Sequence, residues 1–200
     1  MLKFSNIFVN SGRNLIIALV CITILSSCWT SSVFTGASLI YDRHNIYLKL
    51  NNYQLAGQIN QAIYKDKLFK CKTCSIDVAV FNRDVLMVGS VPSHEMRKEA
   101  VERVDAVQGK RKFYNQLRVA DGREDPILDS WITGNIRSKI IGDSSIDPRA
   151  FKIVTSNQVV YIMGDVRKEQ AKTVILFARE TKDVRRVVKL LRYYKYTAKL

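Results

Sequence analysis

Hydrophobic and polar residues alternate in two segments of the chain, residues 76–91 and residues 151–166. A short polar stretch interrupts each segment, at residues 82–84 in the first and at residues 156–158 in the second. Two alternating apolar runs joined by a short polar stretch are typical of a β-hairpin. The pattern therefore predicts two hairpins, each built from a pair of antiparallel strands.

The two hairpins belong to an internal repeat, because they align without a gap and Gly89 falls opposite Gly164. A segment with apolar residues at i, i+4 spacing precedes each hairpin, and a second helix-like segment and a β-rich run follow it. In chain order these segments are 53–65, 93–107 and 112–119 for the first unit, and 129–141, 168–181 and 184–194 for the second. The sequence predicts an α+β fold of two tandem αββαβ modules, each a three-stranded sheet packed on two helices. We expect the modules at residues 53–120 and 129–196, with a polar linker at 121–128.

The N-terminus has the pattern of an export signal. Lys3 and Arg13 precede an apolar stretch at residues 15–25, which is too short to span a bilayer, since that takes about 20 residues. The stretch ends in Leu25-Ser26-Ser27-Cys28, which resembles the lipobox of bacterial lipoproteins. That resemblance implies a signal peptide at 1–27, lipidation of Cys28 and a tether at 28–52. The alternative is an ordinary cleaved signal in which the cysteine has no role.

Composition and charge narrow the class of partner. Apolar residues make up 47% of the chain, which is enough for packed cores. The formal charge of +14 favours polyanions such as anionic lipid head groups, acidic glycopolymers or nucleic acid, and an exported protein does not meet nucleic acid. Basic clusters occur at residues 110–112 and 185–199. They either attract an anionic membrane or are solvated edges of the predicted sheets.

Besides Cys21 in the predicted signal and Cys28 at the lipidation site, two cysteines remain, Cys71 and Cys74, at C-x-x-C spacing. An oxidising compartment permits a local disulfide between them. A redox centre is disfavoured, because thioredoxin-like proteins place this motif between a strand and a helix, whereas here it lies between a helix and a strand. The only two histidines, His44 and His94, lack metal-ligand spacing, so we expect no metal site.

We find no catalytic motif in the sequence. His94-Glu95 lacks the second histidine of a zinc protease helix, since Lys98 stands there, and Gly109-Lys110 lacks the remaining residues of a phosphate-binding loop. Glu124 and Asp125 fall in the predicted linker, away from any rigid platform. We therefore expect a non-enzymatic protein without a cofactor. Gly89 and Gly164 are expected to be structural glycines, required by a close backbone approach or a bulge.

The repeat resembles the BON domain, and the whole chain resembles the dual-BON outer-membrane lipoproteins of Gram-negative bacteria. The matching residues are the two hairpin glycines and the segments 41–43, 109–115, 129–133 and 183–188. Two departures are Asp183, where the second unit would usually have glycine, and the insertion that contains Cys71 and Cys74.

The resemblance implies a lipid-binding helix at the start of the second module. In a helix at 129–141, the apolar arc of Leu128, Ile132, Ile136 and Ile140 faces the sheet and Trp131 falls outside it. Proteins of this family bind anionic phospholipid through this helix, which assigns Trp131, Asn135, Arg137 and Ser138 to lipid binding. From the residues alone, packing of Trp131 between the two modules is an equal alternative.

These observations predict a lipid-anchored envelope protein on the periplasmic side of the outer membrane, since Trp29 replaces the aspartate of an inner-membrane retention signal. It would bind anionic phospholipid and support outer-membrane integrity. The alternative is a periplasmic scaffold for outer-membrane assembly or cell-wall remodelling proteins, for which the tyrosines near the C-terminus would suit an interface.

Overall fold

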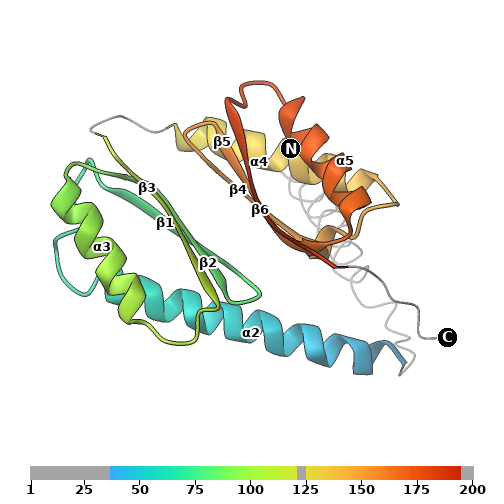
Figure 1. Cartoon of the computed structure of the whole chain (residues 1–200), viewed down its shortest axis with the longest axis horizontal. Coiled ribbons are helices and arrows are strands. Elements are labelled where there is room, and N and C mark those ends of the chain that lie inside the picture. The colour runs from blue at the N-terminus through green and yellow to red at the C-terminus, as the bar shows by residue number, and fades with distance from the viewer. Residues whose placement is uncertain (1–36, 121–124, 195–200) are drawn as a thin grey trace, which may run out of the picture. The chain divides into compact units, whose positions relative to one another are not determined.

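The computed structural model describes residues 37–120 and 125–194 (Figure 1). Both predicted modules lie in one compact unit, Asn45–Leu200. The predicted signal peptide, the lipidation site Cys28, residues 121–124 of the predicted linker and residues 195–200 lie outside the described residues.

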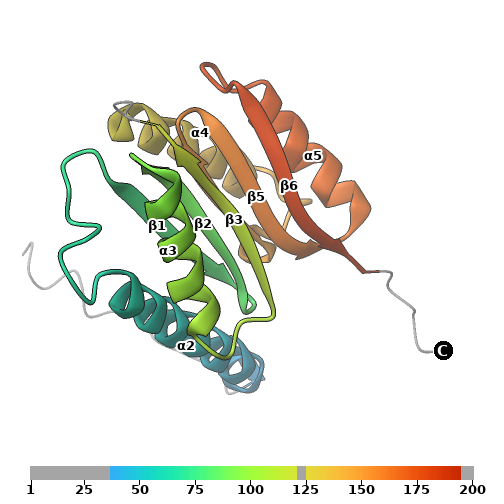
Figure 2. The ribbon, with the colours of Figure 1, turned by 60° about the vertical axis from the view of Figure 1, so that its left-hand side comes forward.

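The first module has the element order α-β-β-α-β. It consists of α2 (Ala37–Ile63), β1 (Ser75–Phe81), β2 (Asp84–Val91), α3 (His94–Ala106) and β3 (Lys112–Val119). Strand β2 is the centre of the sheet, antiparallel to β1 and parallel to β3. The crossover from β2 to β3 runs through α3, which lies on the face of the sheet that α2 also covers (Figure 2).

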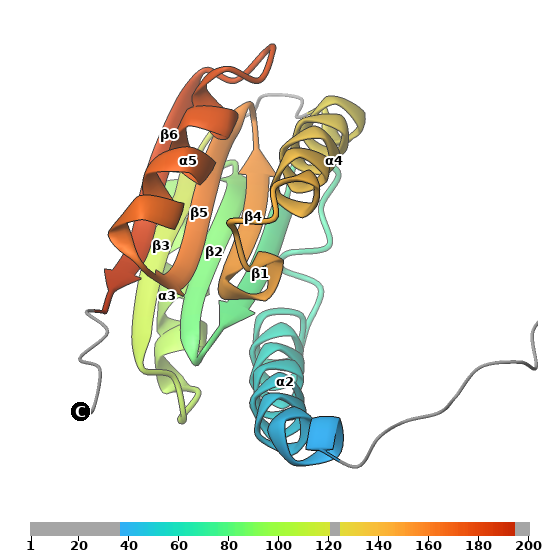
Figure 3. The same cartoon turned by 90° about the vertical axis from the view of Figure 1, so that its right-hand side faces the viewer.

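The second module repeats this topology. It consists of α4 (Pro126–Gly142), a short 3-10 turn η2 (Pro148–Ala150), β4 (Phe151–Ser156), β5 (Val159–Val166), α5 (Lys168–Arg179) and β6 (Arg186–Tyr193). Strand β5 is antiparallel to β4 and parallel to β6. Helices α4 and α5 cover one face of this sheet (Figure 3). The predicted fold, two tandem αββαβ modules, is confirmed.

Each module has its own apolar core between its helices and its sheet. In the first core, Leu55, Ile59 and Ile63 of α2 are buried against the apolar side chains of β2 and α3. In the second core, the equivalent positions of α4 are held by Ile132, Ile136 and Ile140. The i, i+4 spacing that predicted the two helices therefore marks the side of each helix that is removed from water.

The tight hairpin turns hold residues with positive φ in both modules: Asn82 and Arg83 in the first, Asn157 and Gln158 in the second. This is the geometry of a two-residue hairpin loop, whose twist matches that of the strands it joins. The helix in front of each hairpin fixes the turn. Asn52 accepts a hydrogen bond from the backbone N–H of Arg83 at 3.0 Å, and Asp129 accepts from those of Asn157 and Gln158 at 2.7 and 2.8 Å.

The two hairpin glycines lie where another backbone approaches closely. A β-carbon on Gly89 would lie 1.9 Å from the carbonyl oxygen of Ser75, and the φ of Gly89 is +115°. A β-carbon on Gly164 would lie 2.6 Å from the carbonyl oxygen of Ala150, although its φ is ordinary. Both positions therefore exclude a side chain. At Gly89 the close backbone and the positive φ both exclude it, and at Gly164 the close backbone alone does.

The faces of the two sheets that are not covered by helices pack against each other. Their contact is a third apolar cluster, to which β2 and β5 contribute most of the buried side chains. As a result all eight residues of β2 are buried, and seven of the eight in β5. This is the burial pattern of a strand that is covered on both faces.

Polar contacts join the modules around this apolar contact. The side-chain amide of Asn82 donates to Asp165 at 2.9 Å, and the ammonium of Lys152 donates to the carbonyl oxygen of Val80 at 3.3 Å. The amide oxygen of Asn157 accepts from both terminal nitrogens of Arg118, at 2.9 and 3.2 Å, in the amide orientation that satisfies both groups.

Two helices begin earlier than the sequence pattern predicts. Helix α2 begins at Ala37 instead of Tyr53, so residues 37–52 of the predicted tether are helical. Neither glycine nor proline occurs between Ala37 and Gly57, but Tyr47, Leu50 and Tyr53 are exposed, so these positions give none of the buried periodicity that predicts a helix. Helix α4 begins at Pro126 instead of Asp129, inside the predicted linker.

Candidate membrane-binding face

Helix α4 is fixed at its N-terminus and along one side. Asp125 is the N-cap, and its carboxylate accepts hydrogen bonds from the backbone N–H groups of Ile127 and Leu128 at 3.1 and 3.0 Å. Pro126 takes the first helical position, where a missing N–H costs nothing. The buried isoleucines and the hydrogen bonds that Asp129 accepts from the hairpin turn hold the inner side of the helix against the sheet. The opposite side of the helix therefore points away from the sheet.

An apolar stripe runs along the outer side of α4, and we call these residues the α4 stripe: Ile127, Trp131, Gly134, Ser138 and Ile141. Their spacing of three or four residues places them on one side of the helix. The three large side chains are exposed, to 81% for Ile127, 48% for Trp131 and 70% for Ile141. Gly134 and Ser138 between them are exposed as well and add little bulk. The α4 stripe is therefore an apolar surface facing water, the feature that marks a binding site when it is contiguous.

The structure separates the four residues that the sequence assigned to lipid binding. Trp131 and Ser138 lie in the α4 stripe, and Asn135 is half-buried beside it. Arg137 lies on the flank that faces β4, where its guanidinium donates to the carbonyl oxygen of Ile153 at 3.2 Å. Sequence reasoning missed Ile127, which it placed in the linker, although Asp125-Pro126 is a helix-start signal that could have found it.

Trp131 does not pack between the modules, which was the alternative from sequence. It is half exposed and is absent from the apolar cluster that joins the two sheets.

A hollow of about 530 Å³ lies beside the inner flank of α4, lined by residues of both modules. It contains the cations Arg137 and Lys152 and the carboxylates of Asp77 and Asp129. Burial, with the neighbouring charge of Arg137, lowers the pKa of Lys152, although the carboxylate of Asp77 acts in the opposite direction. Arg137 and Lys152 therefore lie at the flank of α4 that is turned toward the sheet.

Of the two predicted basic clusters, the first is engaged in contacts with other residues of the protein. Lys110 donates to the carbonyl oxygens of Asp105 and Val107 at 2.7 and 2.8 Å, and Arg111 forms a two-pronged ion pair with Asp84 at 2.7 and 2.5 Å. In the second cluster, Arg185, Arg186 and Lys189 are exposed, while the basic residues beyond Tyr194 lie outside the described residues.

Comparison with known families decides what the two modules are. The family model described as the BON domain matches residues 51–121 and again residues 128–194. The chain belongs to the BON domain family.

Two proteins similar to this BON chain are the outer membrane lipoprotein DolP of Haemophilus influenzae and the 21 kDa hemolysin of Actinobacillus pleuropneumoniae. DolP is 24% identical over 79% of this chain and 82% of its own length. The hemolysin is 29% identical over 70% of this chain and 72% of its own length. The osmotically-inducible protein Y of Escherichia coli is 28% identical over 48% of this chain and 49% of its own length.

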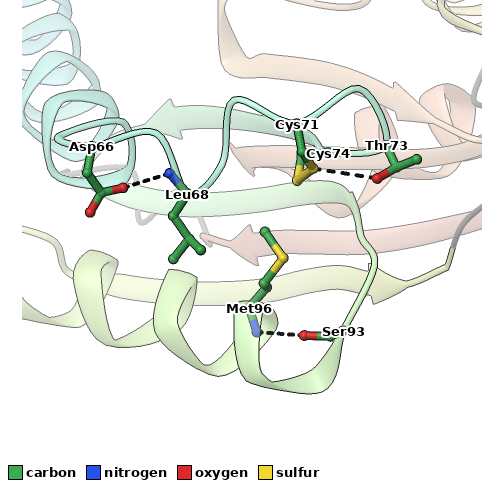
Figure 4. Close-up of a disulfide and its surroundings, with 7 residues drawn as sticks. All are labelled: Asp66, Leu68, Cys71, Thr73, Cys74, Ser93 and Met96. Carbon is green, nitrogen blue, oxygen red and sulfur yellow. Dashed lines mark hydrogen bonds between the residues drawn. A yellow bond between two sulfur atoms is a disulfide. The ribbon is translucent and has the colours of Figure 1, made fainter.

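The cysteine insertion of the first BON domain forms a local disulfide. Cys71 and Cys74 are bonded in the loop between α2 and β1, with the hydroxyl of Thr73 3.5 Å from the sulfur of Cys71 (Figure 4). The same loop buries Phe69, and the guanidinium of Arg103 lies 5.1 Å from the centre of its ring. The loop is therefore anchored to the domain by Phe69, whereas the disulfide joins two residues of the loop itself.

Arg103 is a buried cation in the first BON domain that no sequence pattern singles out. Its guanidinium donates to the carbonyl oxygen of Ile63, to Asp66 and to Glu99, each at 2.7 Å. The hydrogen bond to Asp66 raises the pKa of Arg103 further above its ordinary value, so it stays charged. It joins α2, α3 and the cysteine loop.

Neither a membrane-spanning helix nor a metal cluster occurs in the part of the chain that the structure describes. No helix among residues 37–120 and 125–194 has the length and hydropathy needed to cross a bilayer. In the same ranges, no three His, Cys, Asp or Glu side chains lie close enough together to hold a metal ion.

Proposed function

We propose that this protein is a non-enzymatic, lipid-anchored envelope protein that binds anionic phospholipid through helix α4 of its second BON domain and thereby supports outer-membrane integrity. The observation that carries the proposal is the α4 stripe, in which isoleucines exposed at both ends flank a half-exposed tryptophan. Tryptophan favours the boundary between hydrocarbon and water, because its ring is apolar and its N–H can still reach a polar partner.

Charge supports the choice of an anionic surface. The chain carries a formal charge of +14, and the exposed Arg137 lies at the flank of α4. Each basic residue near an anionic membrane contributes about 1 kcal/mol, reduced by salt. The lipobox-like sequence that ends at Cys28 and the similarity to an outer membrane lipoprotein support the proposed location.

Vesicle co-sedimentation tests the proposal, with a protein of residues 28–200 that carries Cys28→Ser so that no lipid anchor contributes. We expect binding to vesicles that contain phosphatidylglycerol and much weaker binding to pure phosphatidylcholine. Trp131→Glu should weaken binding roughly tenfold or more, because a charged carboxylate must then enter the interface.

Leu176→Glu is the matched control, since Leu176 of α5 is exposed to 50%, nearly as much as Trp131, and lies outside the α4 stripe. It adds the same charge to the same domain and should leave binding close to that of the unchanged protein. Equal binding to both kinds of vesicle, or equal loss from both substitutions, would contradict the proposal.

The second candidate is a periplasmic scaffold that binds outer-membrane assembly or cell-wall remodelling proteins. Tyr193 and Tyr194 favour it, because both are about half exposed at the end of β6 and tyrosine is enriched at protein interfaces. Affinity purification of the tethered protein distinguishes the two. A single dominant protein partner that is retained in Trp131→Glu and lost in Tyr193→Ser would favour the scaffold.

A further inference from the structure

A second hollow, of about 560 Å³, lies where α3 and β3 of the first BON domain meet β5 and β6 of the second. It is on a different surface from α4, since no residue of that helix lines it. Its lining residues come from four elements, so its shape depends on the folded arrangement of both domains.

The lining of this hollow is cationic. Three arginines, Arg97 of α3, Arg118 of β3 and Arg186 of β6, line it together with His94, and no aspartate or glutamate does. Glu95, the neighbouring acid on α3, has its pKa lowered by hydrogen bonds from its own backbone N–H and from Ser93, so it is engaged at the helix cap. Like charges that converge without an acid among them repel one another, and a bound anion removes that repulsion.

Two of the three arginines are uncommitted within the described chain. Neither Arg97 nor Arg186 forms an ion pair or a side-chain hydrogen bond with any residue in the ranges 37–120 and 125–194. Arg118, by contrast, is held by the amide oxygen of Asn157, which fixes its direction at the hollow. The site therefore combines one positioned guanidinium with two that can close on a ligand.

The other polar lining residues suit a small polar ligand. Asn115 and Gln116 of β3 also line the hollow and carry amide side chains, and Tyr161 of β5 is the buried aromatic residue. Helix α3 begins at His94, with Ser93 as its N-cap, so the positive end of the helix dipole lies at the same edge of the hollow. The amide N–H groups and the helix end favour negative charge.

We propose that this hollow, the arginine pocket of Arg97, Arg118 and Arg186, binds a phosphate group carried by a small anion or by a lipid head group. Guanidinium groups bind phosphate through paired N–H donors, which makes arginine the side chain best suited to the task. The volume accommodates two linked phosphates, so inorganic pyrophosphate is a suitable soluble probe.

The test is isothermal titration of the 28–200 protein carrying Cys28→Ser with pyrophosphate, at about 150 mM chloride so that diffuse charge is screened. We expect saturable binding of one pyrophosphate per chain. Arg97→Gln and Arg186→Gln should each weaken it about tenfold, which corresponds to about 1.4 kcal/mol, because each removes a charge-assisted hydrogen bond to the phosphate.

Arg185→Gln is the matched control, since it removes the same charge next to Arg186 from a residue that does not line the hollow. It should change the affinity less than twofold. Absence of saturable binding, or an equal loss in Arg185→Gln and Arg186→Gln, would overturn the proposal, because either result shows diffuse attraction in place of a site.

Vesicles of phosphatidic acid distinguish the two sources of phosphate. If Arg97→Gln weakens both pyrophosphate and vesicle binding, the pocket takes a lipid head group, and if only pyrophosphate binding falls, it takes a soluble phosphate compound. Trp131→Glu should leave pyrophosphate binding unchanged. The proposal for the arginine pocket and the proposal for α4 can therefore be contradicted independently of each other.

Discussion

At the scale of single residues, the fold depends on positions where the backbone leaves no room for a side chain. Gly89 and Gly164 occupy equivalent places in the two hairpins, and each faces a carbonyl oxygen within 3 Å of where a β-carbon would be. Only Gly89 also has a positive φ. The repeat has therefore kept glycine at both places, with steric exclusion as the common cause.

Gly89→Ala should lower the free energy of unfolding by about 3 kcal/mol or more, since the new methyl group would overlap the backbone of β1 and the residue would be held at an unfavourable φ. Gly57→Ala is the control, because Gly57 lies in helix α2 and a methyl group there would have nothing within 4 Å. That substitution should raise stability by about 0.5–1 kcal/mol. Urea unfolding of both variants measures the difference, and a loss in Gly57→Ala as large as that in Gly89→Ala would contradict the steric argument.

Asp183 illustrates a residue-scale departure that the fold tolerates. It stands where the second domain would usually have glycine, and its φ is +65°, in the same left-handed region as Gly109 at +94° in the first domain. Aspartate adopts this conformation more readily than most residues, since its short side chain can bond to the local backbone. The turn before β6 is therefore kept without glycine.

At the scale of elements, each domain is organised by a helix that holds the turn of the following hairpin. The residue responsible lies one helical turn before the first buried leucine or isoleucine, Asn52 in α2 and Asp129 in α4. The first accepts one backbone N–H and the second accepts two. The second domain therefore holds its hairpin turn to the preceding helix with one more hydrogen bond than the first domain does.

Asp129→Ala should lower the free energy of unfolding by about 2–3 kcal/mol, because it leaves two turn N–H groups without their charged acceptor. Asp129→Asn should lose roughly half as much, since an amide oxygen can still accept one of the two bonds, as Asn52 does in the first domain. Ser130→Ala, on the exposed side of the same helix, should change stability by less than about 0.5 kcal/mol. Thermal unfolding checks all three, and an effect of Asp129→Ala no larger than that of Ser130→Ala would show that the turn does not need the helix.

At the scale of the whole molecule, the two BON domains pack through equivalent surfaces, like the halves of a symmetric dimer. Asn82 and Asn157 occupy the same place in the two hairpin turns, and each contacts a polar group of the other domain. Arg118 and Arg192 are also equivalent, because each pairs in register with the residue after the hairpin glycine. The two contacts differ in their partner: Asn82 contacts the carboxylate of Asp165, whereas Asn157 contacts the guanidinium of Arg118.

That carboxylate should make the domain contact sensitive to acid. Burial would raise the pKa of Asp165, but hydrogen bonds from Arg192 and Asn82 and the charges of Arg192 and Arg111 outweigh it and lower the pKa below its ordinary value. A lowered pKa in the folded state means that the ionised group contributes stability above the unfolded pKa of about 3.9, and that this is lost as the pH falls through the folded value. We therefore expect the urea concentration at the unfolding midpoint to decrease once the pH is lowered below about 4.

Asp165→Asn should reduce the midpoint at neutral pH and make it less dependent on pH in the acid range, because the group that titrates in the contact is gone. Comparison with the unchanged protein isolates this residue from the other carboxylates. An unchanged slope in the variant would mean that the acid sensitivity arises elsewhere.

The sequence by itself determined the repeat, the order of the elements, the buried side of each helix and the β3 strand at its observed bounds. These features follow from periodicity and from turn residues, which are local properties of the chain. It also placed Trp131 outside the buried arc of α4, since that follows from helix geometry alone. The starts of α2 and α4 were wrong, because exposed residues such as Tyr47, Leu50 and Ile127 leave no periodic signal.

Only the tertiary structure decided that the two sheets pack face to face, that Trp131 stays exposed, and that Arg97, Arg118 and Arg186 converge. These residues are far apart in sequence, and their meeting depends on how two separately predictable domains dock. Docking buries the side chains on the second face of each sheet. In the sequence, these residues cannot be told apart from those on the second face of any other strand. Which surfaces meet is set by complementary shape and charge across the contact, a property of the folded domains that no single segment carries.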